Sequence, residues 1–394
     1  MKRLVILLII LTMILCGCKT KEPELAQTQP VETEPVTVAP ETTEPATEPE
    51  PTETTQPPTE PDPVEDLLVS MTLEEKVGQL FLARCPWENA AEDVAQYHLG
   101  GYILFGKDFE YKVAEEVLAD VNSYQAMAKI PLLIGVDEEG GTVVRVSSNF
   151  ALREERFQSP RNLFAEGGME RILEDTREKD ALLASMGINL NFAPVADIAI
   201  EPGDFMYKRS FGQDAQATAD FTAQVVAQMA QDNIGSCLKH FPGYGANIDT
   251  HTDIAVDNRP METFLESDLL PFASFPAGEG TTAIMVSHNI VNCWDEEMPA
   301  SLSAEVHRFM REEFGFDGII MTDALDMGAV KAYTNGGNIA VTALQAGNDI
   351  LLVCDYKTGI PAILEAVAEG TLSEDVIDTA CHRVLTWKQS LGLI

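Results

Sequence analysis

Eight short apolar runs recur along this chain, and longer amphipathic segments separate most of them. An alternation of this kind is typical of strand–helix units that build a parallel sheet. The runs are residues 78–83, 101–105, 132–137, 190–197, 236–241, 283–288, 318–323 and 349–354. The helical segments expected between and after them include 108–128, 161–186, 214–232, 302–314, 337–346, 360–369 and 374–391. Eight strand–helix pairs predict an α/β fold, a single (β/α)8 barrel.

Nearly every apolar run ends in a charged or imidazole side chain. In such a barrel the carboxyl ends of the strands open on one mouth, so residues distant in sequence share one pocket. An acidic residue in this position can also cap the following helix, and only the recurrence around the mouth favours a functional site. The candidates are Arg84, Asp137, Asp197, Lys239, His240, His288, Asp323 and Asp355.

Asp323 ends the seventh run, within Ile-Met-Thr-Asp-Ala-Leu-Asp-Met at 320–327. A carboxylate at this point of a barrel is placed to act as a nucleophile or as an electrostatic stabiliser. Asp326 is the alternative, but it falls in the following loop or helix start. The pattern therefore favours Asp323.

The segment 239–253 concentrates two histidines, one lysine and two aspartates. Its Pro-Gly-Tyr-Gly turn predicts that the residues from Asp249 onward lie in a mobile loop beyond the strand. Asp249 and His251 could face each other across a turn, the carboxylate orienting the imidazole and raising its pKa for acid–base transfer. A metal site is the alternative, but the helical spacing of paired histidines is absent and the turn separates the ligands. Those ligands would be His240, Asp249, His251 and Asp253. No metal and no cofactor are expected.

The N-terminal part differs in composition from the rest. Residues 1–18 have a basic start, an apolar stretch at 4–15 and small residues before Cys18, which indicates an export signal too short to span a bilayer. The end of this segment resembles the bacterial lipobox, and Cys18 is the expected lipidation site. Residues 19–63 hold half of the 22 prolines, with many Thr and acidic residues, and predict a disordered tether. The catalytic barrel is expected at 64–394.

The formal net charge is −37, and about −30 of it falls in residues 64–394. Such an anionic surface repels phosphate backbones and anionic lipid headgroups, which argues against nucleic-acid binding and peripheral membrane docking. A neutral substrate fits better, with membrane attachment through the lipid only. The five cysteines beyond the leader show no CxxC spacing and predict buried free thiols rather than disulfides or a zinc site.

Several motifs together resemble glycoside hydrolase family 3, in its β-N-acetylhexosaminidase branch, over residues 65–394. They are Val-Asp-Glu-Glu-Gly-Gly at 136–141, Asn-Phe-Ala-Pro-Val-Ala-Asp at 191–197, Arg-Ser-Phe-Gly at 209–212, Lys-His-Phe-Pro-Gly at 239–243, Asp-Thr-His at 249–251 and Met-Thr-Asp at 321–323. Two positions depart from the family pattern. Tyr244 stands where many members have a second histidine, and Thr142 stands where many have an arginine, which leaves Arg145 as the matching downstream arginine.

The resemblance implies a retaining exo-hydrolase that removes terminal β-linked N-acetylglucosamine. In that mechanism Asp323 attacks the anomeric carbon, and His251, oriented by Asp249, acts as general acid and then as base. The resemblance also implies a sugar subsite lined by Asp137, Arg145, Arg209, Lys239 and His240. We further expect Lys239 to keep the nucleophile ionised at neutral pH.

Three other functions remain open on the sequence. A phosphorylase could use the same covalent intermediate, although the charge of the domain and an extracellular address disfavour phosphate. A β-glucosidase, a xylosidase or another hexosaminidase specificity would differ only in the shape of the pocket. A surface lipoprotein that only binds sugar would be expected to lose a catalytic residue, yet Asp323, Asp249 and His251 are all present. The expected location is outside the cytoplasmic membrane, on a bacterial surface, and the expected substrates there are neutral sugars or fragments of the cell wall.

Overall fold

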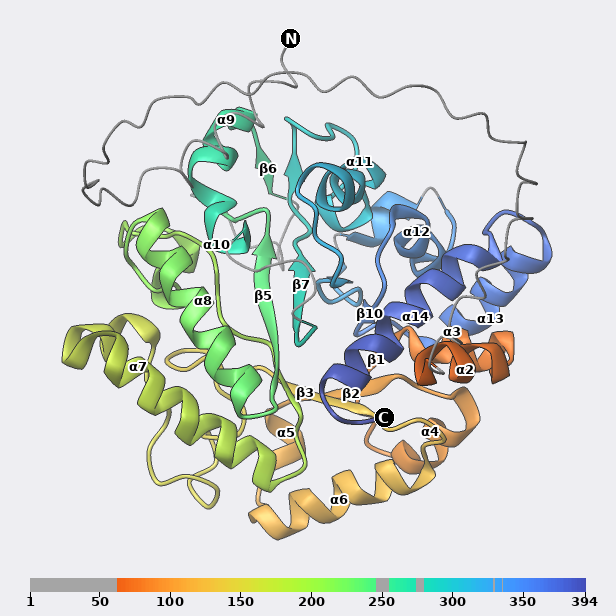
Figure 1. Ribbon diagram of the computed structural model, residues 1–394, viewed down its shortest axis with the longest axis horizontal. Coiled ribbons are helices and arrows are strands. Elements are labelled where there is room, and N and C mark those ends of the chain that lie inside the picture. The colour runs from red at the N-terminus through yellow and green to blue at the C-terminus, as the bar shows by residue number, and fades with distance from the viewer. Residues whose placement is uncertain (1–61, 246–254, 274–279, 329, 335) are drawn as a thin grey trace, which may run out of the picture. The chain divides into compact units, whose positions relative to one another are not determined.

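An eight-stranded parallel sheet forms the centre of the fold in the computed structural model, which describes residues 62–245, 255–273, 280–328, 330–334 and 336–394 (Figure 1). Neighbouring strands pair in the order β10 (Leu351–Leu352), β1 (Phe81–Arg84), β2 (Gly101–Leu104), β3 (Leu133–Val136), β4 (Leu190–Asn191), β5 (Gly235–Phe241), β7 (Thr282–Val286) and β9 (Ile319–Thr322). A parallel bridge between Met321 and Ile350 brings β9 against the residues that precede β10. The sheet is thus nearly closed into the predicted barrel.

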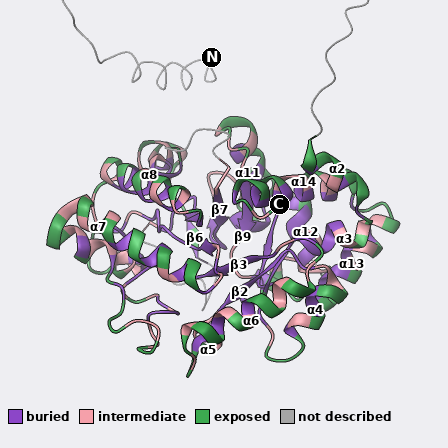
Figure 2. Cartoon of the chain, turned by 60° about the horizontal axis from the view of Figure 1, so that its bottom comes forward, coloured by how far each residue is buried: buried purple, intermediate pink, exposed green. Residues whose placement is uncertain are grey.

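Each predicted apolar run overlaps one strand of this sheet. The first run was placed too early, because residues 78 and 79 end helix α3 (Leu73–Gln79). A reciprocal capping box between Thr72 and Glu75 fixes the start of that helix. The strands are almost entirely buried, as a barrel with helices around it requires, whereas the outward faces of the helices are exposed (Figure 2).

The expected helical segments are present, with three changes. Helix α7 (Pro160–Ser185) is interrupted at Gly167 and Gly168, the latter with φ of 66°, so the predicted segment 161–186 is not one continuous helix. The segment 302–314 divides into a 3₁₀ turn, α11 (Ala304–Arg308) and a π-helical turn (Phe309–Glu313). The segment 108–128 divides into α5 (Gly106–Phe109) and α6 (Ala114–Met127).

The other helices close to their predicted bounds are α8 (Ala215–Gln231), α12 (Ile339–Ala346), α13 (Tyr356–Ala368) and α14 (Glu374–Ser390). Helices α2 (Pro63–Ser70), α4 (Ala90–Tyr97), α9 (Met261–Thr263) and α10 (Leu270–Ala273) were not predicted. Neither was a two-stranded parallel sheet of β6 (Val256–Asp257) and β8 (Ile290–Val291). This small sheet ties the chain that follows residue 254 to the chain that follows β7.

The described residues, from Asp62 onward, belong to one compact unit. The predicted leader 1–18, with Cys18, and all but the last two residues of the predicted linker 19–63 lie outside the described residues. Cys85, Cys237, Cys354 and Cys381 are buried free thiols as expected, whereas Cys293 is only partly buried. Within the described ranges, no helix is both long and apolar enough to cross a membrane.

A lysine is buried between two of the helices that cover the barrel. Lys388 of α14 has no exposed surface, and its Nζ donates a 2.6 Å hydrogen bond to Oε1 of Gln79 at the end of α3. Burial lowers the pKa of Lys388 from 10.5 to about 7. The unfolded chain therefore binds this proton more tightly than the folded chain does. As a result, the free energy of unfolding is reduced at pH values below the unfolded pKa of 10.5.

Replacing this lysine should have a pH-dependent effect on stability. We expect Lys388→Met to be more stable than the wild type at pH 6 and to lose that advantage towards pH 10, by on the order of 4 kcal/mol, because the penalty on the wild type disappears as pH rises to its unfolded pKa. Urea unfolding of both proteins across this range measures the difference. A difference that does not change with pH would show that Lys388 stays protonated in the folded state.

Candidate active site

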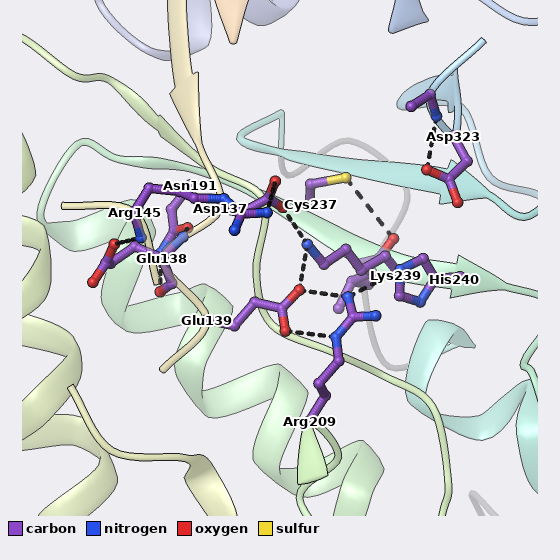
Figure 3. Close-up of polar contacts among 12 residues, drawn as sticks. Asp137, Glu138, Glu139, Arg145, Asn191, Arg209, Cys237, Lys239, His240 and Asp323 are labelled. Atoms are coloured by element: carbon purple, nitrogen blue, oxygen red, sulfur yellow. Dashed lines mark hydrogen bonds and ion pairs between the residues drawn. The ribbon is translucent and has the colours of Figure 1, made fainter. Parts of the chain in front are cut away.

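The charged side chains that follow β3, β5 and β9 converge at the carboxyl ends of the strands, as the strand-end pattern predicted (Figure 3). Asp137 follows β3, Lys239 and His240 lie within the last residues of β5, and Asp323 follows β9. The pairing of β5 with β7 shifts register between Lys239 and Phe241. This irregularity allows the adjacent Lys239 and His240 both to join the site, although successive residues of a regular strand face opposite ways.

Lys239 is the centre of the charge network. Its side chain is 2% exposed, and Nζ lies 2.7 Å from Oδ1 of Asp137 and 2.7 Å from Oε1 of Glu139. Arg209 donates two hydrogen bonds to the same Glu139 carboxylate, at 2.9 and 2.6 Å. The network therefore joins residues of β5, of the chain after β3 and of the long connection between β4 and β5.

The burial of these groups sets their protonation. Burial acts to raise the pKa of Glu139, but the positive charges of Arg209 and Lys239 outweigh it and hold that pKa far below its usual range. Burial acts to lower the pKa of Lys239, and the carboxylates of Asp137 and Glu139 raise it above its usual value. The carboxylate of Glu139 also holds the pKa of Arg209 above its usual value, against burial. Glu139, Lys239 and Arg209 are therefore all charged at neutral pH.

His240 is held in one orientation by two partners. Its Nδ1 lies 2.7 Å from Oδ2 of Asp197, and its Nε2 lies 3.3 Å from Nη2 of Arg209. An arginine nitrogen can only donate, so Nε2 accepts this bond and Nδ1 carries the proton that Asp197 accepts. Asp197 also accepts from the backbone N–H groups of His240 and Tyr244. Asp197 thus positions the imidazole.

Glu138 shapes the loop that carries Arg145. Its buried carboxylate accepts from the backbone N–H groups of Arg145 at 2.7 Å and Val146 at 2.8 Å, and from Ser147. Asn191 of β4 accepts from the backbone N–H of Glu138 at 3.0 Å and donates to its carbonyl at 3.1 Å. The guanidinium of Arg145 lies 3.9 Å from Asp137 as a result.

Glu138, Glu139 and Asn191 have no separate role in the predictions made from the sequence. The only signal was their position beside Asp137 and Asp197 inside motifs of the resemblance. Asp197 was among the strand-end candidates but was not among the residues expected to line the sugar subsite. The roles of these residues depend on their side-chain partners. The sequence does not show which carboxylate forms an ion pair with a given buried cation.

Asp323 is half-buried at the end of β9. Its Oδ1 accepts a 2.7 Å hydrogen bond from the N–H of Ala324, and its own N–H donates to the carbonyl of Val286 in β7. Lys239, which was expected to keep this carboxylate ionised, forms ion pairs with Asp137 and Glu139. The alternative candidate Asp326 pairs with Arg84 at 3.6 Å, and both side chains are about half exposed.

Two other strand-end candidates have structural contacts. Buried His288 places Nδ1 2.7 Å from Oγ of Ser301 and Nε2 3.0 Å from the carbonyl of Ala324, so it supports the turn after Asp323. Asp355 accepts from the N–H of Lys357 and caps α13. Helix capping, the alternative to a functional role for a strand-end acid, is therefore what Asp355 does.

Asp249, His251 and Asp253 lie outside the described residues. The residues that flank that segment are joined through Arg259, whose guanidinium contacts the carboxylate of Asp257 at 2.8 Å and the carbonyl of Gly243 at 3.5 Å. In the part of the chain that the structure describes, no cluster of three His, Cys, Asp or Glu side chains could hold a metal ion. Of the four metal ligands considered, only His240 is described, and both of its ring nitrogens are engaged.

Comparison with known proteins identifies the family. The glycosyl hydrolase family 3 N-terminal domain matches residues 72–387. A β-hexosaminidase of Xanthomonas campestris pv. campestris (strain B100) is 33% identical over 282 residues, which cover 70% of this chain and 82% of the relative. One from Thiobacillus denitrificans is 34% identical, over 66% of this chain and 72% of that protein.

Solved structures show the same relationship. The family 3 β-N-acetylglucosaminidase of Paenibacillus sp. str. FPU-7 superposes with a TM-score of 0.74 at 31% identity, over 82% of this chain and 63% of that chain. A family 3 glycosyl hydrolase from Mycobacterium smegmatis superposes with a TM-score of 0.72 at 26% identity, over 81% of this chain and 98% of the other.

The charge network generates a stability prediction. Glu139→Gln keeps the size of the side chain but leaves the buried charges of Arg209 and Lys239 undercompensated, and we expect a loss of about 3–5 kcal/mol in the free energy of unfolding. Urea unfolding at neutral pH measures it.

The matched control is Asp326→Asn, which breaks an exposed ion pair and should cost less than about 1 kcal/mol. Equal and small effects of the two substitutions would contradict the account of the network.

Proposed function

Because this chain belongs to glycosyl hydrolase family 3, we propose that it is a retaining exo-β-N-acetylhexosaminidase that removes terminal β-linked N-acetylglucosamine. The enzyme is a glycoside hydrolase of the β-hexosaminidase type. The observation that carries the finer proposal is the meeting of Asp137, Lys239 and His240 at one barrel mouth with Asp323. The carboxyl end of β5 carries the sugar-binding Lys239 and His240, and the carboxyl end of β9 carries the nucleophile Asp323.

In the proposed mechanism, a carboxylate oxygen of Asp323 bonds to the anomeric carbon as the bond to the leaving oxygen breaks. His251, oriented by Asp249, gives that oxygen its proton. In the second half-reaction His251 takes a proton from water, whose oxygen displaces Asp323 and releases the sugar. The N–H of Ala324, 2.7 Å from Oδ1 of Asp323, supports this role because it fixes the carboxylate and favours its ionised form.

The proposed sugar subsite uses the network around Lys239. Asp137 would accept hydrogen bonds from sugar hydroxyls, and the remaining donors of Arg145, Arg209 and Lys239 would reach the other hydroxyls or the 2-acetamido group. His240, engaged by Asp197 and Arg209, would line the same subsite through its ring. Because Glu139 and Asp137 already balance Arg209 and Lys239, a neutral sugar can bind without bringing a further charge into this network. The proposed reaction needs no metal and no cofactor.

Kinetics of the two proposed catalytic residues test this mechanism. On 4-nitrophenyl β-N-acetylglucosaminide, we expect Asp323→Ala to lower kcat by at least about 10³-fold because no covalent intermediate can form. His251→Ala should lose about 10²–10⁴-fold on substrates with poor leaving groups and much less on nitrophenyl glycosides, because nitrophenolate leaves without a proton.

Asp326→Ala serves as the matched control, since Asp326 is the neighbouring carboxylate, and it should keep most of the activity. Full activity of Asp323→Ala would contradict the mechanism. The same assay separates the other functions: glycosyl phosphate formed in added phosphate indicates a phosphorylase, faster turnover of the β-glucoside indicates a β-glucosidase, and EDTA should have no effect. Binding without turnover of either substrate would favour a sugar-binding lipoprotein.

We also propose that the enzyme is exported and held at the outer side of the cytoplasmic membrane by lipid on Cys18, with residues 19–63 as the tether. The basic start, the short apolar stretch and the cysteine of residues 1–18 support this location. We expect the full chain to fractionate with membranes in a bacterial host and Cys18→Ala to lose acylation and its membrane association. Labelling with a radioactive or clickable fatty acid measures the modification, and an unlabelled wild-type chain would contradict the anchor.

A further inference from the structure

A buried histidine that the proposed mechanism does not use lies against the turn of the nucleophile. His288, two residues after β7, has no exposed surface. Its Nδ1 lies 2.7 Å from Oγ of Ser301, and its Nε2 lies 3.0 Å from the carbonyl oxygen of Ala324. Ala324 is also the residue whose N–H binds the carboxylate of Asp323. One ring nitrogen of His288 is therefore bound to the residue that follows the proposed nucleophile.

The partners of His288 determine which nitrogen carries its proton. A carbonyl oxygen can only accept, so Nε2 donates to Ala324. In the neutral ring Nδ1 is then an acceptor, and the hydroxyl of Ser301 donates to it. Ser301 is itself fixed, because its N–H donates to the carbonyl of Ser287 at 3.0 Å and its carbonyl accepts from the side-chain amide of Asn348 at 2.8 Å. The imidazole is thus held in one tautomer and one orientation.

The bond from His288 fixes a peptide group next to the one that binds the nucleophile. The peptide between Ala324 and Leu325 is held at both ends. Its carbonyl oxygen accepts from His288, and its N–H donates to the carbonyl of Leu352 in β10 at 3.0 Å. This peptide follows directly after the one whose N–H donates to Oδ1 of Asp323 at 2.7 Å.

The peptide group on the other side is anchored as well. The N–H of Asp323 donates to the carbonyl of Val286 in β7 at 3.0 Å. The N–H of Ala324 that binds the nucleophile therefore lies between two peptides that are tied to neighbouring strands. Of these three anchors, the one from His288 is the only one that a side chain makes. A substitution can remove it and leave the backbone contacts of the turn in place.

A buried imidazole has a desolvation penalty that an apolar side chain at this position would not have. The ring loses its hydrogen bonds to water and regains hydrogen bonds here through Ser301 and Ala324. Preorganised polar contacts lower a reaction barrier because the groups that stabilise the transition state need not reorient as charge develops. The property that this contact supplies is a fixed direction of the Ala324 N–H.

We propose that His288 is a positioning residue for the nucleophile. It fixes the peptide between Ala324 and Leu325 and so keeps the N–H of Ala324 directed at Oδ1 of Asp323 in both half-reactions. The inference rests on the proposed glycosidase mechanism. It adds a residue that acts through Asp323 and not through His251, so its loss should slow the enzyme on good and poor leaving groups alike.

Two variants of the full chain test this role. The amide nitrogen of glutamine can donate from about the position of Nε2, whereas methionine has a similar length and no donor. We expect His288→Met to lower kcat about 10–10²-fold with less than about a threefold change in KM, because the nucleophile is misplaced and substrate contacts are not. The loss should be equal on 4-nitrophenyl β-N-acetylglucosaminide and on its disaccharide with a second N-acetylglucosamine. His288→Gln should keep kcat within about threefold of the wild type.

The pH profile gives a second readout. Loss of the N–H from the carboxylate of Asp323 disfavours its ionised form, so the acid limb of kcat/KM should move to higher pH in His288→Met and stay in place in His288→Gln. Ser301→Ala removes the partner of Nδ1 and should show the same changes at a smaller size, about 3–10-fold in kcat. Ser301→Ala carries the test if His288→Met does not fold.

His307→Met is the matched control. His307 is a second buried histidine, 2% exposed in α11, and its Nδ1 lies 2.8 Å from the carbonyl of Ser303. Its substitution should lower the free energy of unfolding, as measured with urea, and leave kcat and the acid limb unchanged.

Each failure has its own signature. If folded His288→Met keeps the kcat and the acid limb of the wild type, or loses activity on the poor leaving group alone, the positioning role is overturned and the glycosidase function stands. An equal loss in His288→Gln would contradict the role of the Nε2 donor. If the wild type hydrolyses neither substrate, the proposed function fails and the inference fails with it.

Discussion

A lysine with 2% of its side chain exposed cannot keep its charge inside a barrel unless anions lie against it, and the site is organised around that requirement. Lys239 meets it with Asp137 and Glu139, and Glu139 in turn binds Arg209 through two hydrogen bonds. The network fastens three distant parts of the sequence to one point at the barrel mouth. Within this network the two cations, Lys239 and Arg209, are matched by the two carboxylates of Asp137 and Glu139, which suits a neutral ligand.

Around this network, further polar groups hold its members and their neighbours in place. Glu138 gathers backbone N–H groups of the Arg145 loop, and Asp197 fixes the tautomer and orientation of His240. Asn191 joins β4 to Glu138. The desolvation penalty of these buried acceptors is small because each one is hydrogen-bonded to its donors. The contacts also preorganise the side chains that would face the substrate.

The fold was predictable because a barrel repeats one physical pattern eight times: a buried run, a polar strand end and an amphipathic helix. The predicted bounds were wrong where local contacts and backbone angles determine where a helix ends. Residues 78 and 79 belong to α3 rather than to the first strand, and Gly167 and Gly168 interrupt α7. At the site, the strand-end rule found Asp137, Lys239, His240 and Asp323. It could not assign Glu138 and Glu139, since adjacent carboxylates look alike until their partners are known. His288 and Asp355 follow the same rule but serve the structure. The roles of Asp249 and His251 remain predictions from the sequence.

The central claim is that Asp323 forms the covalent glycosyl-enzyme intermediate. The most direct measurement is the mass of the protein after reaction with a 5-fluoro-β-N-acetylglucosaminyl fluoride, followed by peptide mapping. Its fluorine at C5 slows both steps while the fluoride leaving group keeps the first one fast enough for the intermediate to accumulate. The account predicts one added glycosyl group, on Asp323. An adduct on another residue, or complete turnover to the α-anomer of the sugar with no adduct, would contradict it.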